Sequence, residues 1–316
     1  MKPEPKMQQR FSILMLAGMA TIFFVVVGAH ALLLKLNDRV ERGPRSAELR
    51  FEPVHLDSQA FAPLRLMGAW RLASSDPGVT GLSALAFDNG ALMALSDSGT
   101  LVRFPKPAGG HSVGFVRELP GGPGDPRQKI NRDSEALVRD PAGRGWWVAF
   151  ETRDELWLYN NVFTRPLRRI AIPNQELRRN RGIEGMASVG PDLLLLPENG
   201  GPLMRLADNR WSEIPFDFDR KRSSDIAALG DGSLILIERR VTLLGIASAL
   251  VRVKPCETGY CLDWRKELPL GFFDNVEGIA VERAESGATR LWLVTDDDSA
   301  PPRRSLLVEL ELPRQD

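Results

Sequence analysis

The chain has 316 residues, of which 43% are hydrophobic, enough to bury the core of one large domain. Its 41 basic and 41 acidic residues cancel, so the formal net charge is zero. A neutral chain lacks the basic field that attracts nucleic acid, and we expect no nucleic-acid partner.

The first 45 residues differ in composition from the rest. An apolar stretch from Phe11 to Leu34 follows three basic residues and is long enough to span a bilayer as one hydrophobic helix. It predicts either an uncleaved membrane anchor or a signal peptide cut near Ala31, after the small-residue pattern Ala29-His30-Ala31. Both alternatives place residues 46–316 in the bacterial periplasm, and only the first tethers them to the inner membrane.

Residues 46–316 contain five similar segments whose leading residues are 41 to 52 positions apart. In each segment a polar residue opens a short β-type run, and a second run ends on an acid 13 to 19 residues later. The pairs are Ser83 with Asp97, Glu135 with Glu151, Glu184 with Glu198, Asp225 with Glu238, and Glu277 with Asp296. A period of this length is typical of propeller blades.

The strand pattern also fits a propeller. Runs such as 146–148 and 234–237 are rich in aromatic, branched and leucine residues and are separated by turn residues. Four segments supply four strands each, whereas the fifth offers three, so we expect a strand from Leu64 to Leu72 to close the ring. A further strand from Glu48 to Leu56 covers an outer edge or belongs to an irregular sixth blade. The predicted fold is an all-β propeller of four-stranded blades, with five counted and six possible.

A propeller would bring the leading acids to one central channel. The predicted ligands of a metal ion there are Glu135, Glu184, Asp225, Glu277 and, from the end of a second strand, Asp296. Converging carboxylates raise one another's pKa unless a cation neutralises them. Their hard oxygens suit Ca²⁺, which accepts six to eight such ligands.

Basic residues offer a second way to neutralise these acids. Arg132, Arg181 and Arg222 each precede one of the acids by three residues. The planar guanidinium suits a carboxylate or a phosphate, so these side chains form ion pairs within the protein or a cradle for an anion. In the structural alternative, acids at the strand ends tie neighbouring blades to Arg153, Arg239 or Arg240.

The two cysteines are close in sequence. Cys256 and Cys261 flank four residues, a spacing that favours a small loop closed by a disulfide in an exported protein. Two cysteines without nearby histidines supply too few ligands for structural zinc.

The ordered motifs resemble a known family. They are Asp133-Ser134-Glu135-Ala136-Leu137, Gly182-Ile183-Glu184-Gly185-Met186-Ala187, Ser224-Asp225-Ile226-Ala227 and Val276-Glu277-Gly278-Ile279-Ala280. Together they resemble the family named for the esterase-like activity of phytase, exported bacterial propeller proteins, over about residues 64–312. The resemblance implies a calcium-associated propeller that hydrolyses phosphoesters or esters. The segment after Asp297 departs from the family pattern, so the resemblance does not extend to substrate contacts near the last blade.

The sequence therefore predicts a Ca²⁺-dependent hydrolase that acts on an anionic small molecule at the channel mouth. The predicted catalytic residues are Glu135, Glu184 and Glu277, and the predicted substrate-binding residues are Arg132 and Arg181. The alternative is a non-catalytic propeller in which the acids are structural and loops bind a protein, a glycan or a small ligand.

Overall fold

The computed structural model describes residues 42–108, 110–173, 182–198, 200–243, 245–269, 275–296 and 305–313. The predicted N-terminal helix and Arg181 lie outside these ranges. Within them, no helix is both long and apolar enough to cross a membrane. The helical turns described are the short η1 (Ser58–Phe61), η2 (Pro77–Val79) and η3 (Lys129–Asn131).

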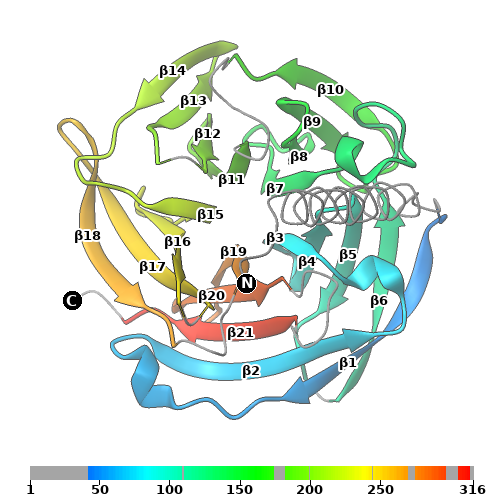
Figure 1. Ribbon diagram of the computed structural model, residues 1–316, viewed down its shortest axis with the longest axis horizontal. Coiled ribbons are helices and arrows are strands. Elements are labelled where there is room, and N and C mark those ends of the chain that lie inside the picture. Colours follow the sequence, from blue (N-terminus) through cyan, green and yellow to red (C-terminus); the bar gives the residue numbers. More distant parts are fainter. Residues whose placement is uncertain are drawn as a thin grey trace, which may run out of the picture.

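Antiparallel sheets stand radially around one axis, as Figure 1 shows, and this confirms the predicted all-β propeller. Blade one contains β3 (Leu82–Asp88), β4 (Ala91–Ser96), β5 (Thr100–Pro105) and β6 (His111–Glu118). Blade two contains β7 (Ser134–Arg139), β8 (Gly145–Phe150), β9 (Glu155–Asn160) and β10 (Pro166–Ala171). Blade three contains β11 (Ile183–Val189), β12 (Asp192–Pro197), β13 (Leu203–Ala207) and β14 (Arg210–Ile214). Blade four contains β15 (Arg222–Ala228), β16 (Leu234–Thr242), β17 (Gly245–Cys256) and β18 (Gly259–Glu267).

Blade five is completed by an N-terminal strand, as the sequence predicts. It contains β19 (Val276–Arg283), β20 (Thr289–Thr295) and β21 (Leu306–Glu311), and β2 (Arg65–Ser74) pairs with the outer side of β21. The strand predicted at 48–56 is β1 (Arg45–Pro53), which pairs with β2 on one side and with β6 on the other. Blades one and five therefore share one nine-stranded sheet, and the described residues form five blades without a sixth.

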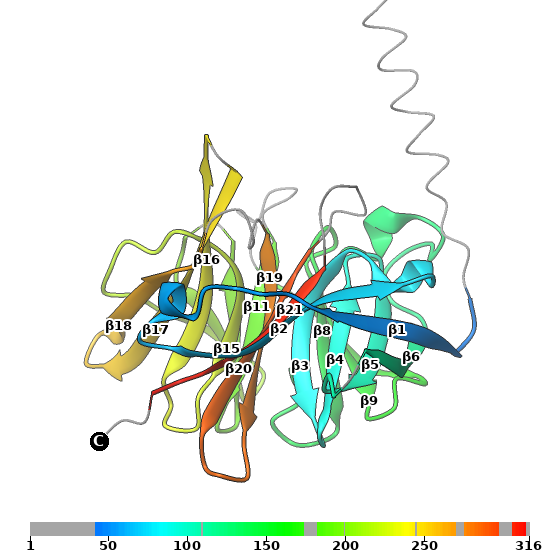
Figure 2. The same cartoon turned by 90° about the horizontal axis from the view of Figure 1, so that it is seen from below.

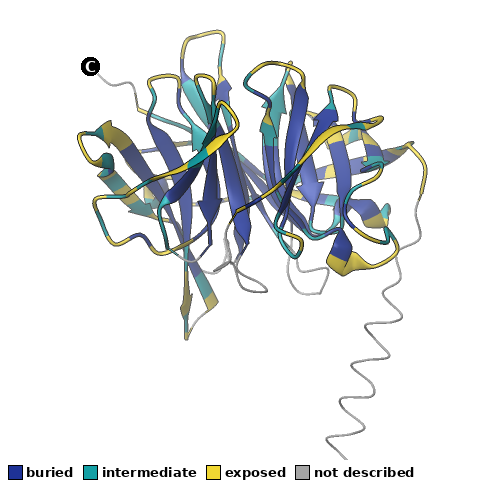
Figure 3. Ribbon diagram, turned by 90° about the horizontal axis from the view of Figure 1, so that it is seen from above, coloured by how far each residue is buried: buried dark blue, intermediate teal, exposed yellow. Residues whose placement is uncertain are grey.

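Apolar side chains fill the space between neighbouring blades. All six residues of β8 are buried, as expected for a strand whose sheet is covered on both faces. Trp70 of β2 stacks on Trp292 of β20 with ring centroids 6.1 Å apart, which helps seal the seam of the ring. Figure 3 shows the buried residues concentrated in the strands and the exposed residues in the connecting loops. This packing holds the inner strands β3, β7, β11, β15 and β19 in fixed positions around the axis.

Candidate functional site

Every inner strand contains a β-bulge near its start. At the same step of each inner strand, the pairing with the second strand of the blade skips one residue. The skipped residues are Ser83, Glu135, Glu184, Ser224 and Glu277. A bulge re-aims a side chain and increases the local twist, so the three glutamates occupy equivalent positions in blades two, three and five.

Blade four differs from the predicted alignment by one residue. Its bulged residue is Ser224, and Asp225 follows the bulge. Asp225 Oδ1 accepts a hydrogen bond from the Ile226 N–H at 2.7 Å, and Oδ2 accepts one from the Ile279 N–H on β19 at 2.8 Å. The buried Asp225 carboxyl thus ties blade four to blade five, and this role accounts for the acid without a metal ion.

Glycine occupies the position after the bulge in blades three and five. A Cβ atom on Gly185 would lie 2.7 Å from the backbone nitrogen of Ile226, and one on Gly278 would lie 2.8 Å from that of Leu85. Both contacts are with the inner strand of the next blade, which could not approach so closely if a side chain were present. The Glu-Gly pairs in the sequence therefore combine a bulged acid with a close contact between blades.

A second ring of charged residues lies where the second strand of each blade meets the start of the inner strand. In each blade, one residue in or just after the second strand pairs with the residue that lies two positions before the bulged residue. These paired residues are Asp97, Glu151, Glu198, Arg239 and Asp296. Blade four thus contributes Arg239 to this ring, in place of the predicted Glu238. Glu238 accepts a hydrogen bond from the Lys221 N–H at 3.0 Å and pairs with Arg265 at 2.7 Å, away from the ring. We call these five residues, with the bulged Glu135, Glu184 and Glu277, the acidic collar.

Arg239 joins three of the collar acids. Its guanidinium donates a hydrogen bond to Glu277 of the neighbouring blade. Its Nη2 lies 3.4 Å from Glu184 Oε2 and 3.5 Å from Glu198 Oε1, so one cation is shared across blades three, four and five. Burial acts to lower the pKa of Arg239, but the nearby Glu277 and Glu184 outweigh it and raise the pKa above its ordinary value. The predicted tie through Arg239 is thus present in the structure.

Two of the acids beside Arg239, Glu277 and Glu184, remain difficult to ionise. Burial is the main cause that raises the pKa of Glu277 to about 7, with Arg239 acting in the opposite direction. Burial also raises the pKa of Glu184 well above the usual range, although Arg239 opposes it. Glu277 can therefore hold or release a proton near neutral pH, and Glu184 keeps its proton to a higher pH than an ordinary glutamate, properties useful in general acid–base chemistry.

Three carboxylates converge on the opposite side of the collar. One oxygen from each of Asp133, Glu135 and Glu151 lies within 4.8 Å of the other two. Glu151 Oε1 accepts a hydrogen bond from the Gly182 N–H at 3.1 Å, and Asp133 Oδ2 accepts one from the Thr152 hydroxyl at 3.0 Å. Within the described ranges, no basic side chain lies in ion-pair contact with any of the three acids. We call this group the carboxylate cluster.

Two members of the carboxylate cluster have raised pKa values. Burial, followed by repulsion from Glu184 and Asp133, raises the pKa of Glu135 well above its ordinary value. Burial is also the first cause that raises the pKa of Glu151 to about 7. A divalent cation would relieve this repulsion, and three carboxylates together with water could supply the oxygen ligands that Ca²⁺ requires. The described donors therefore fit Ca²⁺.

The motifs that form the collar belong to a recognised family. The family model for the esterase-like activity of phytase matches residues 77–299, more than two thirds of the chain. The chain belongs to this phytase-like family. The match covers all five inner strands and thus confirms the resemblance seen in the sequence.

One solved structure supports the propeller fold of this phytase-like chain. Glutaminyl cyclase from Myxococcus xanthus superposes with a TM-score of 0.52 at 11% identity, over 79% of this chain and 97% of that one. Regucalcin, a calcium-binding protein from Agrobacterium tumefaciens, has a TM-score of 0.44 at 11% identity, over 75% and 93% of the two chains. At this identity, the similarity to glutaminyl cyclase concerns the fold alone. No curated protein matches the sequence.

The remaining predicted site residues of the phytase-like propeller have different surroundings. The Arg132 side chain is 2% exposed, and its guanidinium lies beside Gly122 and Phe150 between blades one and two, not in the collar. Its predicted substrate-binding role has no support from this position, because the side chain does not reach solvent. Asp296 belongs to the collar, and its N–H donates a hydrogen bond to the Asn275 carbonyl at 2.8 Å.

Two further predictions concern residues outside the collar. Cys256 and Cys261 form a disulfide with Cα atoms 5.9 Å apart, at the turn between β17 and β18. Arg153, predicted as a tie to an acid, instead donates a hydrogen bond to the Asn131 side chain at 3.0 Å.

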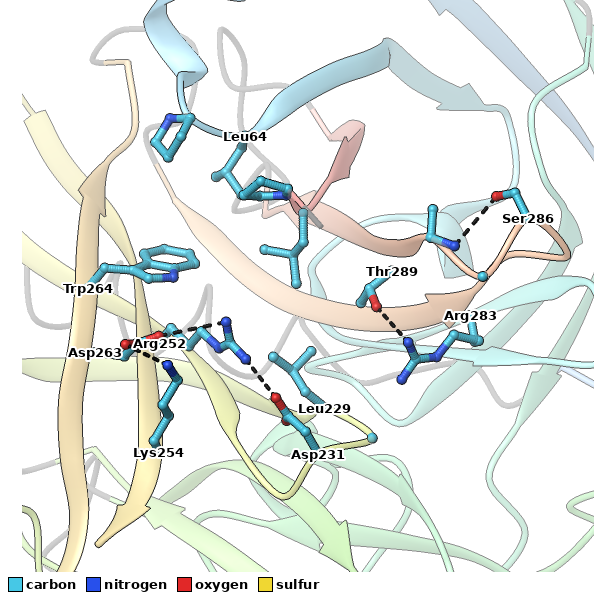
Figure 4. Close-up of a pocket in the computed structure, with 16 residues that line it drawn as sticks. Leu64, Leu229, Asp231, Arg252, Lys254, Asp263, Trp264, Arg283, Ser286 and Thr289 are labelled. Carbon is cyan, nitrogen blue, oxygen red and sulfur yellow. Dashed lines mark hydrogen bonds and ion pairs between the residues drawn. The ribbon is translucent and has the colours of Figure 1, made fainter. Parts of the chain in front are cut away.

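A cavity of about 660 Å³ lies between blades four and five, away from the collar (Figure 4). It borders the β15–β16 and β19–β20 turns, which are at the opposite ends of these strands from the collar residues. Its charges are largely paired: Arg252 contacts Asp231 at 2.7 Å, and Lys254 contacts Asp263 at 2.9 Å. None of the predicted site residues lines this cavity.

Proposed function

We propose that this phytase-like propeller is a Ca²⁺-dependent hydrolase that acts on phosphoesters or esters of small anionic molecules at the collar. The observation that carries the proposal is the carboxylate cluster of Asp133, Glu135 and Glu151, whose oxygens approach within 4.8 Å of one another. Such convergence is costly without a cation and is suited to one. Of the predicted ligands, Glu135 would hold the ion, with Asp133 and Glu151 added.

Bound at the cluster, Ca²⁺ would polarise a phosphoryl or ester oxygen and acidify a water molecule. We propose that Glu184 transfers the proton, because it interacts electrostatically with both Glu135 and Glu277. Since its pKa is raised, Glu184 can donate a proton to the leaving group and then accept one from water. Glu277, held by Arg239, orients the neighbouring groups and keeps a second exchangeable proton near pH 7.

The charge of the collar sets an order of binding. The carboxylates of the cluster must ionise to hold the cation, and once ionised they would repel an anionic substrate until the cation is bound. The cation must therefore bind first, and Arg239 takes the role that the sequence assigned to Arg132 and Arg181. We also propose, from the N-terminal sequence, that residues 46–316 act in the periplasm beside the inner membrane.

A non-catalytic binding propeller is the second candidate. It is favoured by the hydrogen bonds of Asp225 and Arg239, which use collar-level charges to tie blades together. In that case substitutions in the collar would change the stability of the protein, and neither the variants nor the unsubstituted protein would show turnover.

The test combines metal binding with turnover. We expect Ca²⁺ to raise the melting temperature of the purified protein and to be required for cleavage of p-nitrophenyl phosphate or a short p-nitrophenyl ester. Glu135→Gln should abolish both effects, whereas Glu184→Gln should abolish turnover and leave the Ca²⁺ shift unchanged. Glu213→Gln, on the exposed face of β14, is the matched control. Ca²⁺ binding without turnover on either substrate would exclude the hydrolase and favour the binding propeller.

A further inference from the structure

Blade four has a hairpin that extends beyond the collar. The β16–β17 pairing continues from Arg239 opposite Ser248 to Thr242 opposite Gly245. The β15 pairing with β16 stops at Arg239, and the β18 pairing with β17 stops at Ala249, so the last residues of the hairpin form a ribbon of two strands only. Figure 2 shows this ribbon projecting past the other blades. At about 3.4 Å per residue, the ribbon rises roughly 10 Å above Arg239.

The tip of this ribbon is apolar and exposed. Val241 is 81% exposed and Leu243 is 105% exposed, the two highest values among the large hydrophobic residues described. Arg240, beside them, is also exposed. Single exposed hydrophobic residues are common on protein surfaces, but two at the end of a projecting hairpin form a prominent apolar point. Neither residue contributes to the core of the propeller.

The chain enters the propeller on the same side. Arg45, the first residue of β1, lies opposite Val116 near the end of β6 and lines a small pocket with Ser98 and Thr100. Ser98 directly follows the collar residue Asp97 in the β4–β5 turn. Strand β1 therefore begins beside a turn that belongs to the collar side of blade one.

The sequence before β1 limits how far the propeller can lie from a membrane. Ten residues separate Leu34, the end of the apolar stretch, from Arg45. Fully extended, ten residues span at most about 35 Å. If the stretch remains in the bilayer as an anchor, Arg45, on the collar side of blade one, stays within about this distance of the lipid.

We infer that the β16–β17 hairpin is a second membrane contact, which inserts Val241 and Leu243 into the bilayer and turns the collar toward the lipid surface. The tether makes the insertion effectively intramolecular, so two apolar side chains are sufficient for a stable contact. Arg240 lies at the height of the phospholipid headgroups and suits their phosphates. The inference depends on the anchor and not on the proposed hydrolysis. It restricts substrates to molecules at or near the membrane surface.

The test places a fluorescent reporter at the hairpin tip of the full chain. Leu243→Trp protein is reconstituted in phosphatidylcholine–phosphatidylglycerol vesicles, with or without lipids brominated on the acyl chains. We expect the fluorescence added by the new tryptophan, relative to the unsubstituted protein, to be lost in brominated vesicles. The control is Val162→Trp in the β9–β10 turn, which is 63% exposed at the opposite end of blade two, and its added fluorescence should be unchanged.

Two results would overturn the inference. One is equal fluorescence of Leu243→Trp in brominated and ordinary vesicles while the melting temperature remains that of the unsubstituted protein. The other is shielding of the tip from aqueous iodide only after a second protein is added, which would assign the hairpin to a protein partner. The measurement needs no enzymatic activity, so failure of the proposed hydrolysis would not affect it.

Discussion

Arg239 on β16 donates a hydrogen bond to Glu277 on β19, the inner strand of the next blade. The same guanidinium lies near Glu184 and Glu198. One arginine therefore balances three buried acids, and its removal would leave them to repel one another.

We predict that Arg239→Met lowers the free energy of unfolding by about 3–5 kcal/mol, the usual cost of removing one partner of a buried ion pair. The loss should increase as the pH rises through about 7, because Glu277 then becomes charged and needs the arginine more. Arg240→Met at the next, exposed position is the control, with an expected change within about 0.5 kcal/mol. Urea denaturation of both variants provides the comparison, and equal stabilities would contradict the role of Arg239.

The stability of the metal-free protein should fall as the pH rises. Glu277 and Glu151 have pKa values of about 7 in the folded state against an ordinary 4.5, so the folded protein holds protons that the unfolded chain has released. Their contribution to stability is complete below pH 4.5 and is lost as the pH rises through about 7.

Melting temperatures measured from about pH 5 to 8 with a chelator would reveal this slope. Added Ca²⁺ should flatten it, because the ion favours the deprotonated carboxylates of the cluster. Glu151→Gln should reduce the slope without Ca²⁺. A melting temperature that rises across this range in the chelated protein would refute the assignment.

Substitutions of Asp225 and of Glu135 should have opposite effects on stability and on Ca²⁺ binding. Asp225→Asn leaves one backbone N–H without its acceptor, and we expect a loss of about 1–3 kcal/mol in stability with no change in Ca²⁺ affinity. Glu135→Gln removes a charge from a repelling cluster, so it should weaken Ca²⁺ binding and preserve or raise the stability of the metal-free protein. Calorimetric titration and thermal melts separate the two effects. Loss of Ca²⁺ binding in Asp225→Asn would contradict this assignment and show that Asp225 is a ligand of the metal ion.

Gly185 should tolerate no side chain. Gly185→Ala would place Cβ 2.7 Å from the Ile226 backbone nitrogen, which cannot move without shifting β15. We expect a loss of about 1–3 kcal/mol or more from this overpacking. Gly110→Ala, where no atom lies within 4 Å of the added Cβ, should be nearly neutral. Similar melting temperatures for the two variants would show that the blades do not pack as described.

Much of the fold could be predicted from repetition. The spacing of the five segments gave the blade count among the described residues, and the missing strand in the last segment pointed to β2. The sequence left β1 open between covering an outer edge and forming a sixth blade, because outer-edge pairing depends on which strands lie free after the ring has closed, and the structure shows the first alternative. The N-terminal helix lies outside the described residues and stays a prediction.

The site was harder to predict because bulges are not visible in a strand pattern. Their matching chemistry aligns Asp225 and Glu238 with the acids of the other blades, but both are offset by one residue from the equivalent positions. A one-residue shift moves a side chain to the other face of a strand. Aligning Ser224 with the bulged glutamates would have placed Arg239 in the ring. Asp133 belongs to one of the sequence motifs, but nothing in the strand pattern marks the position two residues before a bulge as a ligand position.

The seam closed by β1 also determines how the protein bears mechanical load. Because β1 pairs with both β2 and β6, any pull transmitted through the N-terminus acts first on those two ladders of hydrogen bonds. If the chain is anchored, drag on the propeller would be resisted at the junction of blades one and five, and rupture would begin there and leave blades two, three and four folded longest.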